Sequence, residues 1–109
     1  IDKESKHNQL AAYVNRAGAY QAKGDYARAI EDFGKALAIE PGSAVVLLAR
    51  GAAQHSKGDL DAAIADYDKA IEADKKNVGA FMARASAWRA KGDAEKMLAD
   101  IESAVKLEK

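Results

Sequence analysis

The tripeptide Lys-Gly-Asp occurs three times in this chain, and each copy lies 34 residues after the one before it. The agreement extends well beyond the tripeptide on both sides, so the chain is one structural unit repeated three times. A regular period of this length predicts a stack of similar units rather than a domain closed around one core. The copies are Lys23-Gly24-Asp25, Lys57-Gly58-Asp59 and Lys91-Gly92-Asp93.

Apolar and small residues recur three or four positions apart on both sides of each tripeptide. This spacing places them on one face of a helix before the tripeptide and on one face of a second helix after it. Residues 1–9 are polar, contain no helix breaker, and would either extend the first helix backwards from about Ser5 or belong to a preceding element. We therefore expect helices at 10–23, 26–39, 44–57, 60–73, 78–91 and 94–107.

The tripeptide itself has the composition of a helix stop followed by a helix start. Its glycine can adopt the positive φ that a helix end commonly needs, and its aspartate can cap the next helix. Between units, Pro41 ends one helix, while Ser43 and Asn77 are expected to cap the helices that follow them. We therefore interpret Lys-Gly-Asp as a turn rather than as a ligand site.

The pattern resembles the tetratricopeptide repeat family, in residues 10–109 with units at 10–43, 44–77 and 78–109, and with residues 1–9 as an N-terminal extension. The resemblance implies an all-α, right-handed superhelical solenoid of three helix-turn-helix repeats. The run Asn15-Arg16-Ala17-Gly18, together with Ala-Ile-Glu-Asp-Phe at 29–33, resembles bacterial members, so we expect a bacterial source. The matching positions are the small residues Ala17, Gly51 and Ala85, the alanines Ala29 and Ala63, the later alanines Ala36, Ala70 and Ala104, and the closing Pro41.

An arginine and an aspartate also recur once in every unit, at similar distances before and after the turn. In an antiparallel helix pair such residues stand at the same height. We therefore expect ion pairs within each unit, or the neighbouring pairs between units. The expected pairs are Arg16–Asp32, Arg50–Asp66 and Arg84–Asp100.

Composition argues against several functional classes. Seventeen basic residues balance 17 acidic ones, whereas a nucleic-acid-binding chain usually carries a basic excess. There is no cysteine and no apolar run of the roughly 20 residues that span a membrane. His7 and His55 have no partner at metal-ligand spacing, and no acid–base pair stands out. We expect no enzyme activity, no cofactor or metal, no nucleic acid partner and no membrane insertion.

In the resembled family, the first helix of each repeat lines a concave groove. Here that groove would carry an apolar strip flanked by polar residues, suited to a protein or peptide partner of apolar or amphipathic character. One branch of the family holds a terminal carboxylate in a clamp, at positions that fall on Val14, Gly18, Ala49, Gly79 and Ala83, none of which can grip a carboxylate. The expected groove residues are Val14, Asn15, Gln21, Val45, Leu48, His55, Met82 and Arg89.

The third unit departs from the repeated pattern, and no polar capping helix follows it. The alternative prediction is therefore a homo-oligomeric assembly module that packs through its terminal helices. Because the chain begins at Ile1, it is expected to be a processed product or a non-catalytic fragment of a longer protein. A chain without cysteine leaves the compartment open, with the cytoplasm favoured and the periplasm as the alternative. The expected assembly surface consists of Met97, Leu98, Ile101 and Val105.

Overall fold

The computed structural model describes residues 3–108, so Ile1, Asp2 and Lys109 lie outside the described residues. All regular structure in residues 3–108 is helical, as predicted. Five of the six helices have the predicted bounds, and α1 continues backwards through 3–9 without a break. The helices are α1 (Lys3–Ala22), α2 (Tyr26–Ile39), α3 (Ala44–Lys57), α4 (Leu60–Ala73), α5 (Val78–Lys91) and α6 (Ala94–Leu107).

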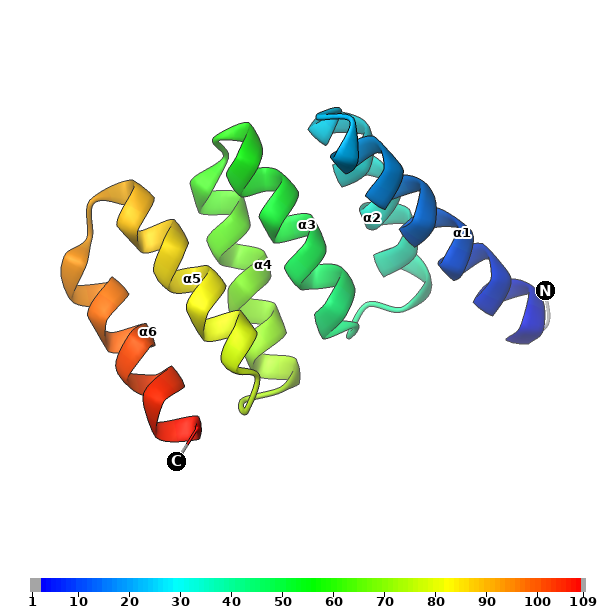
Figure 1. The fold of residues 1–109 in the computed structure, drawn as a ribbon. Coiled ribbons are helices and arrows are strands. Elements are labelled where there is room, and N and C mark those ends of the chain that lie inside the picture. The colour runs from blue at the N-terminus through cyan, green and yellow to red at the C-terminus, as the bar shows by residue number, and fades with distance from the viewer. Residues whose placement is uncertain (1–2, 109) are drawn as a thin grey trace.

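The helices form three antiparallel hairpins that stack in a row, with the two ends of the chain at opposite ends of the molecule (Figure 1). The main contacts join helices that follow one another in the chain, and α3 also touches α5. The molecule is elongated, with extents of 45 × 29 × 18 Å. The chain is therefore an all-α solenoid, in which each repeat packs on its neighbours.

The turn inside each hairpin is built as the tripeptide predicts, with one exception. Gly24, Gly58 and Gly92 have φ values of 82°, 94° and 83°. The carboxylates of Asp25 and Asp93 accept hydrogen bonds from the backbone N–H groups of Arg28 and Lys96, at 3.2 and 3.1 Å.

The remaining helix starts test the other expected caps. Asp59 makes no capping hydrogen bond with its side chain, so the prediction of a side-chain cap is wrong at this turn. Ser43 and Asn77 cap α3 and α5 as predicted, accepting from the N–H groups of Val46 and Ala80. Four of the five expected caps are therefore present, and the helix bounds follow from them.

The core is made of alanines with a few large side chains between them. Phe33, Leu37, Val46 and Leu47 form the centre of one cluster, and Tyr67 belongs to a second cluster around Ile64. Small side chains let helix axes approach closely, which suits a core only two helix layers thick. The alanines with no exposed surface are Ala17, Ala29, Ala36, Ala53, Ala63, Ala70, Ala80 and Ala87.

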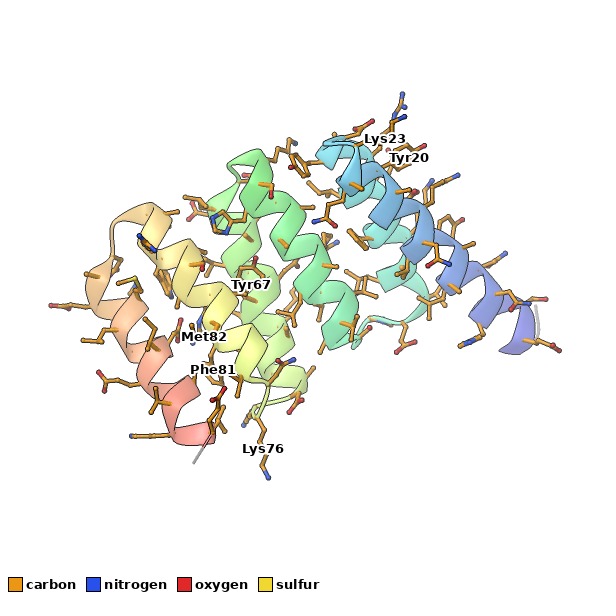
Figure 2. All side chains as sticks on the ribbon, viewed as in Figure 1. Tyr20, Lys23, Tyr67, Lys76, Phe81 and Met82 are labelled. Carbon is orange, nitrogen blue, oxygen red and sulfur yellow. The ribbon has the colours of Figure 1, made fainter. Side chains whose placement is uncertain are left out.

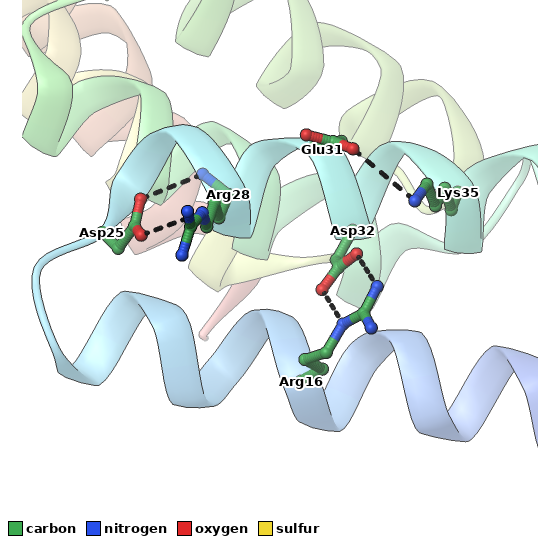
Figure 3. A network of polar contacts seen from close by, with 6 residues as sticks. All are labelled: Arg16, Asp25, Arg28, Glu31, Asp32 and Lys35. Carbon is green, nitrogen blue, oxygen red and sulfur yellow. Dashed lines mark hydrogen bonds and ion pairs between the residues drawn. The ribbon is translucent and has the colours of Figure 1, made fainter.

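All three predicted ion pairs within repeats are present. In the first, Nε and Nη2 of Arg16 donate to the two carboxylate oxygens of Asp32, at 2.6 and 2.8 Å. Figure 3 shows Arg16 reaching from α1 to Asp32 on α2, and Asp32 is only 2% exposed. The hydrogen bond from Arg16 holds the pKa of Asp32 below its ordinary value.

The other two pairs repeat this geometry. Arg50 donates to Asp66 at 2.7 and 2.8 Å, and Arg84 donates to Asp100 at 2.9 and 2.7 Å. In each repeat, a buried carboxylate of the second helix is thus held by a forked guanidinium from the first. The pairs clamp the two helices of each hairpin at one fixed height.

Candidate functional site

The eight residues expected to line a groove all lie on the first helices of the repeats. These helices, α1, α3 and α5, run side by side across the near side of the view in Figure 1. Val45 is 75% exposed and Met82 is 45% exposed, and both are large apolar side chains. Asn15 and Arg89 are also exposed, whereas Val14, Gln21, Leu48 and His55 are half-buried.

Two of the four apolar groove residues contribute to the core. Val14 packs against the first core cluster, and Leu48 packs against both clusters. The reason lies in the stacking, because α3 stands between the first and third repeats and contacts α2, α4 and α5. The freely exposed apolar surface on this face is therefore carried by Val45 and Met82.

A second apolar surface lies at the end of the solenoid, between α5 and α6. Two shallow hollows there, of about 270 and 130 Å³, share Met82 and Ile101 in their linings. Val78 and Val105 line the larger hollow, and Met97 lines the smaller one. Figure 2 shows Met82 on α5, beside α6. The end surface thus joins Met82 to three of the residues expected to form an assembly surface.

The remaining member of that expected surface, Leu98, is 54% exposed, as is Val105. The equivalent residue of Leu98 in the second repeat is Ile64, which is 7% exposed, and the equivalent of Val105 in the first repeat is Leu37, at 8%. These two inner positions are covered because another repeat follows them. Leu98 and Val105 mark where a following helix would pack.

Two ion pairs cross the junction between the second and third repeats. Nη1 of Arg84 donates to Asp68 at 2.8 Å, and Lys91 pairs with Asp61. Sequence reasoning missed both pairs because the two aspartates are not part of the repeated pattern. One signal could have found them: Asp61 and Asp68 lie on exposed positions of the second helix of a repeat, and that helix packs against the first helix of the next repeat, which carries Arg84 and Lys91.

The N-terminal end carries a hollow of about 720 Å³, between the start of α1 and the end of α2. Leu10 and Ile39 provide its apolar part, and His7 lies at its rim among charges of both signs. These side chains do not converge on a common point as metal ligands would. Among residues 3–108, no group of three or more histidines or carboxylates is placed to hold a metal ion.

One buried polar atom was not anticipated. Oε1 of Gln54 is buried without a hydrogen-bond partner in the described part of the chain. Gln54 occupies the position that Tyr20 and Trp88 fill in the other repeats, so a polar amide stands where the pattern places an aromatic ring. Separately, no helix within residues 3–108 is long and apolar enough to cross a membrane.

Family models of the tetratricopeptide repeat match residues 8–76 and, in a second form, residues 58–107. The chain belongs to the tetratricopeptide repeat family. The matched ranges overlap and together cover the three hairpins, so the family assignment applies to the whole solenoid. No match to this tetratricopeptide repeat chain was found among curated proteins.

Solved tetratricopeptide repeat domains have the same fold. The Arabidopsis OM64 domain is 23% identical, with a TM-score of 0.88 over 94% of this chain and 85% of that one. The second such domain of human RPAP3, in complex with the HSP70 peptide SGPTIEEVD, is 26% identical, with a TM-score of 0.87 over 94% and 86%. The second domain of Spaghetti (RPAP3), bound to the HSP90 peptide SRMEEVD, is 24% identical, with a TM-score of 0.85 over 95% and 98%.

Proposed function

We propose that this tetratricopeptide repeat domain is a non-enzymatic scaffold that binds an apolar or amphipathic peptide segment of a protein partner across α1, α3 and α5. Similar domains of RPAP3 bind peptides, which supports protein recognition as the general role. The observation that carries the finer proposal is the exposure of Val45, which at 75% is the most exposed large apolar side chain described. Met82, at 45%, lies on the same row of helices.

Small residues beside these side chains support the approach of a peptide backbone. Gly18 and Gly79 are exposed on these helices, and apart from the adjoining residues and backbone of α1 no described atom lies within 4 Å of where a Cβ of Gly18 would be. An extended or helical segment can therefore come close to the helices while its apolar side chains contact Val45 and Met82. Asn15 and Arg89 would supply polar contacts at the edges.

The chemistry of this face argues against the peptides that the RPAP3 domains bind. Both of those peptides end in the acidic sequence EEVD. The positions that family resemblance assigns to a carboxylate clamp hold Val14, Gly18, Ala49, Gly79 and Ala83 here, and their side chains carry no charge and no hydrogen-bond donor. We therefore propose a partner segment recognised by its apolar side chains and not by a terminal carboxylate.

A library of displayed random peptides, selected on the purified domain, tests this proposal. We expect enriched peptides to carry apolar residues three or four positions apart, and we expect Val45→Glu to abolish their binding. Ala38→Glu, on an exposed position of α2, adds the same charge away from this face and should leave binding unchanged. Enrichment of peptides ending in acidic residues, or equal binding by both variants, would contradict the proposal.

Leu48→Glu is a poorer test than Val45→Glu. Leu48 packs against both core clusters, so a carboxylate there would be placed among apolar side chains and would lower stability together with binding. Assembly through the terminal helices, the alternative predicted from the sequence, would share Met82 with this face, since Met82 also lines the hollows beside α6, but it would leave Val45 uncovered.

A further inference from the structure

The two ends of the solenoid carry complementary packing faces. One end shows the face of a first helix, α1, and the other end shows the face of a second helix, α6, and such faces pack together at the junctions between repeats. At the junctions inside the molecule, the first helix of one repeat packs on the second helix of the preceding repeat. On α3 and α5, Val46, Ala53, Ala80 and Ala87 are buried and belong to the two core clusters.

On α1, the positions equivalent to these are Ala12 and Ala19, and both are exposed. In residues 3–108 no repeat packs on this side of α1, so these two alanines are uncovered in the structure. At the other end, Leu98 and Val105 on α6 are each 54% exposed, and no further helix packs on them within the described residues. The small side chains of α1 therefore match the apolar surface of α6 in the way that α5 matches α4.

The charges at the two ends are also complementary. At the junction of the second and third repeats, Arg84 pairs with Asp68 and Lys91 pairs with Asp61. One repeat further along the chain, the equivalents of the two aspartates are Glu102 and Glu95 on α6. On the first helix of the chain, the equivalents of the two cations are Arg16 and Lys23.

We propose that a second copy of this chain docks head to tail, with its α1 on the open face of α5 and α6, so that the solenoid continues from one copy into the next. Arg16 of the incoming copy would pair with Glu102, and Lys23 would pair with Glu95. In Arg84, Nη1 is the atom that donates to Asp68 across the junction. In Arg16, Nε and Nη2 donate to Asp32, and within the described residues Nη1 makes no hydrogen bond, so it is available to a second copy. The Arg16 side chain is 55% exposed, against 23% for Arg84.

The charge match is not a property of every junction. At the junction of the first and second repeats, the positions of Asp68 and Asp61 hold Gly34 and Ala27, so no such pairs form there. The repeat pattern alone therefore does not explain why Arg16 and Lys23 at one end match Glu102 and Glu95 at the other. A contact of this kind joins two different surfaces, so it does not close on itself and produces open chains whose length grows with concentration.

Sedimentation equilibrium of the full chain over a wide concentration range tests the proposal. We expect the average mass to rise beyond that of a dimer, and to fall when salt is added, because the two ion pairs are exposed. Lys23→Glu and Glu95→Lys should each weaken association about fivefold, by replacing an attraction with a repulsion. In residues 3–108 neither side chain forms an ion pair, so both variants should remain folded. Glu95→Lys should be slightly less stable than the wild type, because it places a positive charge in the first turn of α6.

Mixing the two variants in equal amounts provides the decisive comparison. Each variant repels its own copies, but the glutamate introduced by Lys23→Glu attracts the lysine introduced by Glu95→Lys, so the mixture should associate as strongly as the wild type. Leu98→Glu should also abolish association, while Val45→Glu, on the proposed peptide-binding face, should leave it intact. A wild type that is monomeric at every concentration, a mass that stops at two copies, or a mixture that does not recover would each overturn the proposal.

Discussion

Gly51 on α3 lies against the ring of Tyr67 on α4, so closely that a Cβ atom at position 51 would be 2.5 Å from Cε1 of the tyrosine. Tyr67 is 2% exposed, so its ring has no room to move away. In the first repeat, Ala17 takes the position of Gly51 and Phe33 takes the position of Tyr67. The smaller residue thus faces the larger side chain.

Gly51→Ala should therefore destabilise the protein. Alanine is the better helix former by about 1 kcal/mol, but overpacking costs about 1–3 kcal/mol, and we expect a net loss of about 1 kcal/mol in the free energy of unfolding. Gly18→Ala is the matched control, since nothing lies within 4 Å of its Cβ position, and it should raise stability. Denaturant titration of both variants measures the two effects, and a stabilised Gly51→Ala would show that the ring can yield.

The two kinds of turn aspartate predict different responses to the same substitution. Asp93→Ala removes a carboxylate that caps α6 and should lower the free energy of unfolding by about 1 kcal/mol. Asp59→Ala removes a carboxylate that makes no capping bond, so its cost should be a few tenths of a kcal/mol at most. Thermal unfolding of the two variants compares them, and equal losses would mean that Asp59 caps α4 in solution.

The buried ion pair of the second repeat should be far more important than a surface pair. Arg50→Met leaves the carboxylate of Asp66, which is 2% exposed, without its partner, and should cost about 3 kcal/mol. Glu31→Gln breaks the exposed Lys35–Glu31 pair on α2 and should cost less than about 1 kcal/mol. Urea titrations at neutral pH measure both, and similar small losses would indicate that water reaches Asp66.

The pair between Arg16 and Asp32 predicts a dependence of stability on pH. Because the folded state holds the pKa of Asp32 below its unfolded value of about 3.9, the pair stabilises the fold fully above that pH. The stabilisation is lost as the pH falls from there through the lowered pKa. The difference in unfolding free energy between wild type and Arg16→Gln should thus be constant above about pH 5 and shrink in acid, and a difference that stays constant into acid would contradict this assignment.

Most of the fold could be predicted from the sequence because the signals are local and occur three times. A glycine with positive φ, a cap residue and a proline fix where helices begin and end, and the spacing of Arg16 and Asp32 follows from an antiparallel pair. The missing cap at Asp59 depends on the detailed geometry of one turn, which no residue pattern encodes.

The candidate site was harder to predict because it depends on contacts between repeats. Spacing places Leu48 on a helix face but does not say which neighbouring helix covers that face, and α3 has three neighbours. The pair of Arg84 with Asp68 likewise needs the stacking of α5 on α4 to be known. The ion pairs that rest on one hairpin were confirmed, whereas those that rest on a junction needed the structure.

The stacking of hairpins on their neighbours has a consequence for mechanical load. Since the main contacts join helices adjacent in the chain, a force applied at the two ends passes through each hairpin in turn. In the described part of the chain, the first junction lacks ion pairs equivalent to the two that cross the second junction, and apolar packing joins its two repeats. Since each repeat is stabilised only by its neighbours, we expect tension to separate the first hairpin from the second before it separates the second from the third.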